Sequence, residues 1–145
     1  KFRTDPTNQQ THFFRNKIRR DLLPLLQGKY QSNIQEVLCN LAITAGEDYE
    51  YLRQETQKIF PRLIQKRTPA GSVALDLRKL QALPNAIKRM VLRSAIDQVK
   101  GDTLALTLAH LSELGDLISK RPTGAIVNLP HGIRAVKMKE SLVIK

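Results

Sequence analysis

The residues near the start of the chain whose types and spacing suit chemistry are basic and amide side chains that can hold an anion. Arg15, Asn16, Arg19 and Arg20 fall within a stretch of helical periodicity. Residues four apart project from one face of a helix, so Arg15 and Arg19 should form one row beside Asn16 and Arg20. Two guanidinium groups in register can bind adjacent phosphates, or one can bind a carboxylate through two hydrogen bonds. Surface or domain-bridging salt bridges explain the same pattern, and the pattern alone favours them.

Other candidates for chemistry are few. Asp5 and Asn8 precede the basic helix on a turn-forming segment, where we expect them to orient an arginine or to cap the helix. The seven glycines are scattered instead of forming a phosphate-binding loop, and the three histidines are far apart in sequence. Cys39 stands alone, and we expect a half-buried thiol on a helix. These patterns predict neither an ATP loop nor a metal site.

The charge of the chain is strongly positive and unevenly distributed. The 145 residues include 24 Lys and Arg against 13 Asp and Glu, giving a formal charge of +11. Seven basic against two acidic residues in 1–30, and nine against two in 61–100, flank an acidic segment at 31–60 with two against five. Such segregation favours a polyanionic partner: RNA, DNA or an acidic membrane surface. The alternative is a basic domain whose charge only keeps it soluble.

Length and composition predict one domain with a real core, or one domain plus a short appendage. A single cysteine predicts an intracellular protein, and no apolar run is long enough to span a membrane. We therefore expect a cytoplasmic protein without a membrane partner. The start at Lys1, without a signal peptide or an initiating Met, suggests the cut end of a longer protein.

The basic residues of the second half form the other candidate surface for a polyanion. Arg89 and Arg93 share one face of a predicted helix, while a solvated charged face is an equally good explanation for any single residue. Tyr49, Phe14 and Phe60 are expected in the core, so we expect recognition by shape and phosphate contact more than by stacking on bases. The candidates in this group are Arg62, Lys66, Arg67, Lys88, Arg89 and Arg93.

Periodicity predicts a mainly helical fold. The first helix should span about 11–26, bent or ended by Pro24 and stopped by Gly28. A long helix follows over about 33–65, with an apolar stripe from Ile34 to Leu63, although Pro61 is expected to stop it near Phe60. A strand at 73–77 leads into a helical turn at 78–83 and a helix at 84–100, which Gly101 breaks.

The last part of the chain changes character. Asp102 or Thr103 should cap a helix on which Leu104 begins an apolar stripe ending at Ile118. Short strands are expected at 124–129, 133–136 and 141–144, and the 73–77 strand is a candidate to pair with them. The predicted fold is a small helical bundle with a C-terminal β-hairpin or three-stranded element, α+β overall. The predicted organisation is a connecting segment at 1–30, a helical nucleic-acid-binding domain at 31–120 and a β tail at 121–145.

Several motifs resemble one enzyme family. The segments DPTN at 5–8, RNKIR at 15–19 and LLP at 22–24 resemble the end of the catalytic domain of tRNA(Ile)-lysidine synthetases. In that family a D-x-S-N element precedes R-N-x-I-R and a Leu-Pro, so Thr7 is a mild departure. Residues 74–77, 80–84 and 86–96 resemble the family's central substrate-binding domain, and 123–132 resemble its strand-turn ending. The resemblance covers essentially the whole chain, although its later motifs are less specific than the first.

The resemblance implies an activity for a longer parent protein. Such enzymes are ligases that use ATP, with Mg, to adenylate the wobble cytidine of an isoleucine tRNA with a CAU anticodon, and free lysine then displaces AMP. The implied partners are this tRNA and an upstream ATP-binding domain. The resemblance also allows an oligomer. The ATP-binding loop is absent, so we expect no cofactor in this chain and no activity from it alone. The residues implied at the border of the active site are Asp5, Asn8, Arg15, Asn16 and Arg19.

The implied roles leave alternatives open. Arg15 and Arg19 would contact tRNA phosphate, ATP phosphate or a carboxylate of the catalytic domain. Two other classes of protein also fit the residues: a stand-alone basic helical nucleic-acid-binding module, or a protein-interaction scaffold for an acidic partner. A DNA-reading module would need a short recognition helix after a tight turn, and no such spacing stands out.

Overall fold

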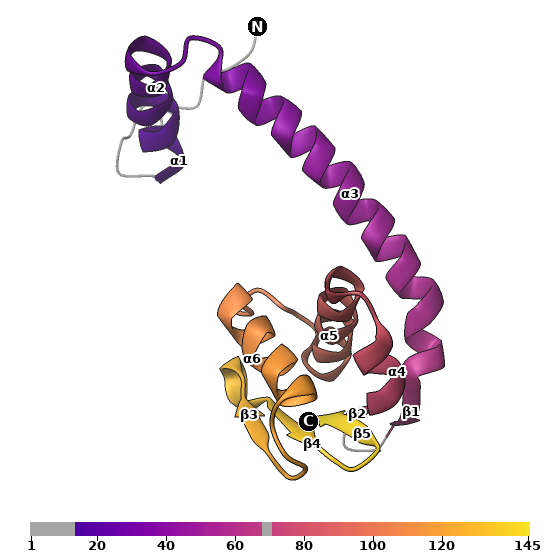
Figure 1. Cartoon of the computed structure of the whole chain (residues 1–145). Coiled ribbons are helices and arrows are strands. Elements are labelled where there is room, and N and C mark those ends of the chain that lie inside the picture. Colours follow the sequence, from indigo (N-terminus) through magenta and orange to yellow (C-terminus); the bar gives the residue numbers. More distant parts are fainter. Residues whose placement is uncertain (1–13, 68–70) are drawn as a thin grey trace, which may run out of the picture. The chain divides into compact units, whose positions relative to one another are not determined.

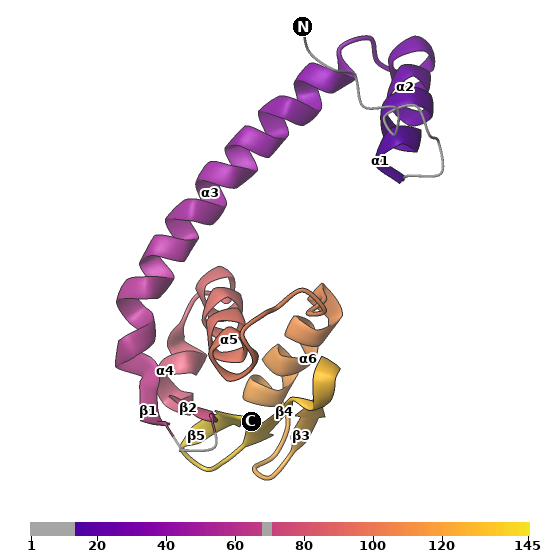
Figure 2. The same cartoon turned by 180° about the vertical axis from the view of Figure 1, so that it is seen from behind.

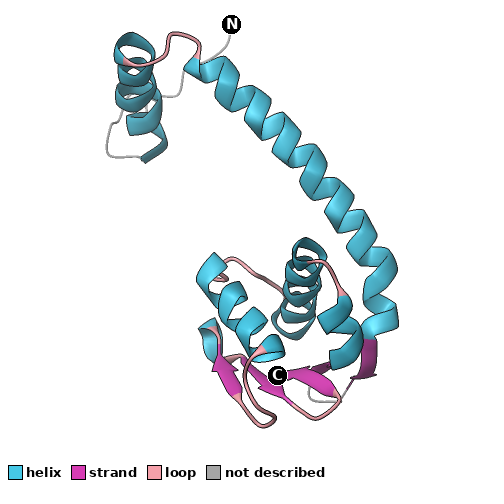
Figure 3. Ribbon diagram, in the orientation of Figure 1, coloured by secondary structure: helices cyan, strands magenta, loops and turns pink. Residues whose placement is uncertain are grey.

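The structure is a computed structural model that describes residues 14–67 and 71–145 (Figure 1). The chain divides into two compact units, one ending at Asp48 and the other comprising Tyr49–Lys145. Each unit is described here by its own elements. Helices, strands and loops are distinguished by colour in Figure 3.

The described part of the first unit begins with three consecutive helical elements, α1 (Phe14–Lys17), η2 (Ile18–Leu22) and α2 (Leu23–Lys29). The middle element is a π-helical turn, in which the Leu23 N–H donates to the Ile18 carbonyl five residues back. Pro24 explains this turn, because proline has no N–H and its ring crowds the carbonyl four residues earlier. The helical hydrogen bonding thus changes to the π pattern just before Pro24, and the helix then continues as α2. The predicted end at Leu26 and stop at Gly28 were wrong, since α2 runs to Lys29.

Helix α3 (Ile34–Leu63) contributes to both units and is longer than the position of Pro61 suggested. It does not end at Phe60 but continues through Pro61 to Leu63. Phe60 and Leu63 are both buried in the core, and this packing holds the last turn in place despite the missing proline N–H. Only Thr56, Phe60 and Leu63 are buried among the side chains of this helix. The predicted apolar stripe is therefore covered at its C-terminal end, whereas Leu41 is exposed.

The second unit contains a five-stranded antiparallel sheet. Its strands are β1 (Ile64–Arg67), β2 (Val73–Asp76), β3 (Ile126–Asn128), β4 (Arg134–Lys137) and β5 (Ser141–Ile144), in the order β1-β2-β5-β4-β3. The expected three-stranded ending is present, and the expected pairing of the 73–77 strand with it is confirmed by the register Val73–Ile144. Strand β1 was not predicted. It forms by pairing with β2 across an irregularity between Ile64 and Lys66.

Helices α4 (Leu77–Ala82), α5 (Asn85–Lys100) and α6 (Leu108–Ser119) cover one face of this sheet, as both views show (Figures 1 and 2). Asp76 caps α4 by accepting a hydrogen bond from the Lys79 N–H at 2.9 Å. Gly101 ends α5 with φ 87°, a left-handed conformation that glycine adopts without strain. The predicted limits of α4 and α5 are confirmed to within a residue or two.

The start of α6 differs from the prediction. Thr107 caps it, and His110 completes a capping box by accepting a hydrogen bond from the Thr107 N–H at 3.1 Å. Leu104 lies in the preceding loop, 96% exposed, and is not part of the apolar stripe. The leucine spacing was misleading because the chain needs a loop to turn from α5 back across the sheet.

The core lies between the sheet and its helical layer. Leu75 and Leu142 point into it from the strands, Val91 from α5 and Leu114 from α6, and each is fully buried. The mainly helical α+β class is confirmed, with the helices packed as a layer on a sheet that is larger than expected. At about 25 cal/mol per Å² of buried apolar surface, this interface is the main stabilising feature of the unit.

Candidate nucleic-acid interface

Helix α5 lies between two grooves, and three of its basic residues, Lys88, Arg89 and Arg93, are divided between them. The first groove, of about 480 Å³, separates α5 from α6. Lys88 and Arg89 line its α5 side, Ser112 and Asp116 line its α6 side, and Leu92 contributes to its apolar part. The mixture of cationic, hydroxyl and apolar groups suits a sugar–phosphate backbone, which presents anionic, hydroxyl and apolar surfaces together.

Hydrogen bonds orient two charged groups beside this groove. The half-buried Lys88 donates from Nζ to the Gln81 carbonyl at 3.3 Å, which holds its ammonium near the end of α4. Asp116 pairs with Lys120 at 2.8 Å, and the hydrogen bond from that ammonium lowers the pKa of the Asp116 carboxyl. Arg89 is exposed and has no ion-pair partner among residues 14–67 and 71–145. The α5 side of the groove thus keeps a guanidinium group available for an anion.

The second groove, of about 280 Å³, separates α5 from the C-terminal half of α3. Arg93 and Asp97 line it from α5, and Arg53 lines it from α3. Arg89 and Arg93 are four residues apart on α5, yet they line different grooves, so they flank the helix instead of forming one paired grip. Arg53 and Glu50 form an ion pair at 2.8 Å, and the hydrogen bond from Arg53 lowers the pKa of Glu50 to about 2.

The remaining candidates of the second half lie where α3 meets the sheet. Arg62 is exposed in the last turn of α3, and its carbonyl accepts a hydrogen bond from Lys79 Nζ at 3.1 Å. Lys66 and Arg67 lie on β1, the edge strand of the sheet.

The candidates of the first unit lie on its first helices. Arg15, Arg19 and Arg20 are exposed, and Asn16 is buried. Because Arg19 and Arg20 belong to the π-helical turn, their angular spacing from Arg15 differs from that of a regular α-helix. Asp5 and Asn8 lie outside the described residues.

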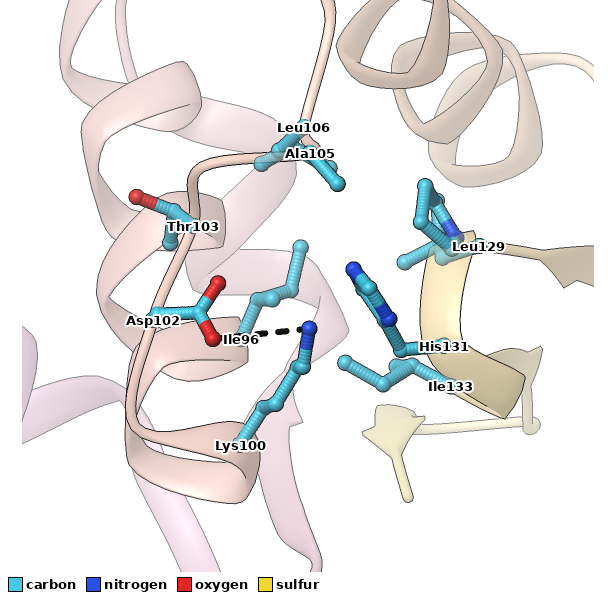
Figure 4. Close-up of a pocket in the computed structure, with 10 residues that line it drawn as sticks. Ile96, Lys100, Asp102, Thr103, Ala105, Leu106, Leu129, His131 and Ile133 are labelled. Carbon is cyan, nitrogen blue, oxygen red and sulfur yellow. Dashed lines mark ion pairs between the residues drawn. The ribbon is translucent and has the colours of Figure 1, made fainter.

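A third, much smaller cavity lies between the α5–α6 loop and η3 (Pro130–Gly132). Figure 4 shows the ion pair between Lys100 and Asp102, 3.5 Å, beside the His131 ring. Its volume of about 10 Å³ is at the limit for one water molecule. We therefore assign this cavity to the packing of the turn, where His131 adopts φ 63°.

Sequence reasoning placed three side chains wrongly and overlooked another. Cys39 is exposed, not half-buried. Tyr49, expected in the core, is 54% exposed and lines the α3/α5 groove, whereas Phe60 is buried as expected. Phe14 is also exposed, contrary to expectation. Thr56 lines the same groove as Tyr49, and no sequence signal distinguished it from the rest of the α3 stripe.

No cluster of three or more His, Cys, Asp or Glu side chains is placed to hold a metal ion in the part of the chain that the structure describes. Within that same part, no helix combines the length and the apolar character needed to cross a membrane. The described chemistry consists of cations, hydroxyl groups and two grooves around α5. That combination is the electrostatic footprint expected of a basic nucleic-acid-binding domain.

Comparison with known proteins shows what this chain is similar to. Residues 75–138, from β2 to the end of β4, match the family described as the TilS substrate binding domain. The chain is 30% identical over 142 residues to a tRNA(Ile)-lysidine synthase of Clostridioides difficile, and 30% identical over 143 residues to one of Caldanaerobacter subterraneus subsp. tengcongensis. These alignments cover 98% and 99% of this chain and 30% of each relative. A third relative, from Solibacter usitatus, is 31% identical over 85% of this chain and 27% of its own length.

These matches agree with the resemblance carried by the sequence motifs. The chain is similar to tRNA(Ile)-lysidine synthases over nearly its whole length, and it spans about 30% of the length of the curated relatives. The part that matches the substrate-binding family contains α5 and α6, and with α5 it contains one wall of each groove.

Proposed function

We propose that this chain is the tRNA-binding part of a tRNA(Ile)-lysidine synthase. The observation that supports the proposal most strongly is that the basic residues of the grooves lie within the segment that matches the substrate-binding family. The segment that matches the substrate-binding family, residues 75–138, includes the helix whose Lys88, Arg89 and Arg93 line two open grooves. Cations on groove walls bind a phosphate backbone and release its counterions, which gives affinity without base reading.

In this proposal α5 meets the RNA with its solvent-facing side. Lys88 and Arg89 bind backbone phosphates through the α5/α6 groove, and Arg93 does so through the α3/α5 groove. Arg62, Lys66 and Arg67 add positive charge near the end of α3. The sheet is the support that fixes α5, because Val91 and Ala95 on the opposite side of the helix are fully buried.

The first unit has a different proposed role. Asp5, Asn8, Arg15, Asn16 and Arg19 border the catalytic site of the parent enzyme. Arg15 and Arg19 bind tRNA phosphate, ATP phosphate or a carboxylate of the ATP-binding domain, and Arg20 is a further contact for the RNA. The parent enzyme uses ATP, Mg and lysine to convert the wobble cytidine of the CAU anticodon to lysidine, in the cytoplasm. The 145 residues alone are proposed to bind tRNA without catalysing this ligation, and an assay for lysidine formation checks that statement.

Binding measured across a salt series tests the proposal. The chain is titrated with isoleucine tRNA bearing the CAU anticodon, with initiator methionine tRNA and with duplex DNA of matched length. Each phosphate contact contributes a slope of about −0.7 to −0.9 in a plot of log K against log salt. We expect tighter binding to both tRNAs than to DNA, with a slope that records several phosphate contacts. Equal affinity for all three polyanions favours a general basic module, and absence of binding favours an interaction scaffold.

Paired variants locate the binding surface. Replacing Arg89 with Met should weaken tRNA binding by about tenfold and reduce the salt slope by about one. Arg134 is a matched control because it is also an exposed arginine, but it lies on β4 of the sheet. Arg134→Met should bind tRNA as the unmodified chain does. If Arg134→Met weakens binding more than Arg89→Met, the RNA lies on the sheet and the proposed surface is wrong.

A further inference from the structure

The groove between α3 and α5 contains a buried hydroxyl group without a partner. Thr56 is 2% exposed, and its Oγ1 makes no hydrogen bond within residues 14–67 and 71–145. Buried hydroxyl groups in folded proteins are nearly always hydrogen-bonded, because an unmade bond leaves the desolvation of the group uncompensated. The groove is the open space that Thr56 lines. Its volume of about 280 Å³ is close to the lower end of ligand pockets, about 300 Å³.

Three kinds of side chain meet in this groove. Arg93 is half-buried and makes no hydrogen bond or ion pair among the described residues, whereas the neighbouring Arg53 is held by Glu50 through two bonds of 2.8 Å. Arg93 is therefore the guanidinium group that is available for an anion. Asp97 is an exposed carboxylate on the same helix, one turn further on, and is a hydrogen-bond acceptor.

The third kind of side chain is aromatic. Tyr49 lines the groove from α3 and is 54% exposed, so its ring is available to a ligand. Aromatic rings bind unpaired bases by stacking, and any base can stack because each has a π-face. An arginine for phosphate, a carboxylate for a ribose hydroxyl and an aromatic ring for a base together match the three parts of one nucleotide.

We propose that the α3/α5 groove binds one unpaired nucleotide of the RNA, with its base on Tyr49 and its phosphate on Arg93. Asp97 accepts a hydrogen bond from the ribose 2′-hydroxyl, and Thr56 completes the polar end of the site. This inference rests on the proposed function, because it assumes that RNA is the partner. It goes further by adding contact with a single-stranded residue to the backbone contacts of the α5/α6 groove.

Binding to single-stranded and duplex RNA tests the inference directly. The full 145-residue chain is titrated with a short single-stranded RNA and with a blunt duplex of the same length. Tyr49→Ala and Arg93→Met should each weaken binding to the single strand by about tenfold. Tyr49→Phe keeps the ring and should bind as the unmodified chain does. Neither Tyr49 variant should change binding to the duplex by more than about twofold, because paired bases cannot stack on Tyr49.

The stability of Thr56→Val provides a second measurement. Valine has the shape of threonine without the hydroxyl, so this variant should raise the melting temperature of the free chain by a few degrees. The increase in melting temperature on adding the single-stranded RNA should be smaller than in the unmodified chain. Free nucleoside monophosphate should compete only weakly with the RNA. Tighter binding of the monophosphate than of the RNA would overturn the assignment to an RNA strand.

The outcomes separate this inference from the proposed function. If Tyr49→Ala and Arg93→Met bind single-stranded RNA within about twofold of the unmodified chain while Arg89→Met loses tRNA affinity, the nucleotide site is wrong and the tRNA-binding function stands. If the unmodified chain binds no tRNA, the proposed function fails first. Loss of single-strand binding in Tyr49→Ala with recovery in Tyr49→Phe supports the site.

Discussion

Lys137 should be one of the strongest single contributors to the stability of the unit formed by residues 49–145. It lies on β4 and is 8% exposed. Its Nζ donates to the carbonyl oxygen of Ile118 at 2.9 Å and to that of Arg121 at 2.6 Å. These carbonyls are at the C-terminal end of α6, where no further turn of helix satisfies them and where the helix dipole favours a cation.

The magnitude follows from these two bonds. A hydrogen bond from a charged donor contributes about 1.5–3 kcal/mol, and a buried carbonyl left without a partner keeps its desolvation cost. That cost applies to the Arg121 carbonyl, whereas the Ile118 carbonyl also accepts a hydrogen bond from Gln81 Nε2 at 2.9 Å. Lys137→Met keeps most of the aliphatic stem but removes both bonds. Because it also removes the cost of burying an ammonium group, we expect a net loss of about 2–4 kcal/mol. For a unit of this size, that loss corresponds to a fall in melting temperature of roughly 10–20 °C.

Urea unfolding followed by far-UV circular dichroism measures the effect. Lys139→Met is the matched control, because Lys139 is exposed in the turn that follows β4 and should change stability by less than about 0.5 kcal/mol. The difference between the two variants should persist in high salt, which screens surface charges but not buried bonds. A Lys137→Met variant as stable as Lys139→Met would refute the assignment of α6 capping to Lys137.

Three further predictions concern single positions and can be checked by thermal unfolding. Gly115→Ala should stabilise α6 by up to about 1 kcal/mol, because a Cβ there would meet nothing within 4 Å. Gly101→Ala should instead destabilise the folded chain by about 1–2 kcal/mol, because the φ of Gly101 is +87°. The opposite ranking of these two variants would contradict the backbone argument. Thr107→Ala should lose about 1 kcal/mol with the capping box of α6, and an unchanged melting temperature would rule that box out. The Asp76 carboxylate accepts a hydrogen bond from the Lys79 N–H, which lowers the pKa of Asp76 below the ordinary 3.8. The contribution of Asp76 to the free energy of unfolding is therefore complete above pH 3.8 and is lost as the pH falls through the folded-state pKa. Asp76→Asn caps the helix without titrating, so this variant should lose less stability between about pH 5 and pH 2 than the unmodified chain, and equal losses would argue against this linkage.

The elements that the sequence predicted well are those with both a periodic pattern and a local stop signal. Helix α5 has an apolar face, a preceding Pro84 and a following Gly101, and all three agree with the structure. Helix α6 shows the limit of the pattern alone. Leu104 has the correct spacing to continue the stripe, but Thr107 and His110 supply the cap, and a side-chain cap decides where a helix starts.

The elements that the sequence did not predict depend on tertiary contacts. Residues 64–67 have three polar side chains in four positions, and they form β1 only because β2 is there to pair with them. Pro61 remains inside α3 because Phe60 and Leu63 are anchored in the core. Such packing cannot be read from local propensity.

The candidate site was predicted in part for the same reason. Basic residues of α5 were identified from charge alone, but their division between two grooves depends on which neighbours pack on each side of the helix. Tyr49 was assigned to the core because it fits the 3.6-residue stripe of α3. Its ring is exposed because the apolar stripe is covered only over the last turns of that helix, where Thr56 and Phe60 are buried.

The most direct test of the account is a map of where tRNA contacts the chain. Isotope-labelled chain is titrated with isoleucine tRNA bearing the CAU anticodon, and backbone amide shifts are followed by NMR. We expect the first amides to shift to lie on α5 and on the walls of its two grooves, including those near Arg89 and Arg93. Shifts concentrated on the exposed face of β4 and β5, with α5 unchanged, would contradict it.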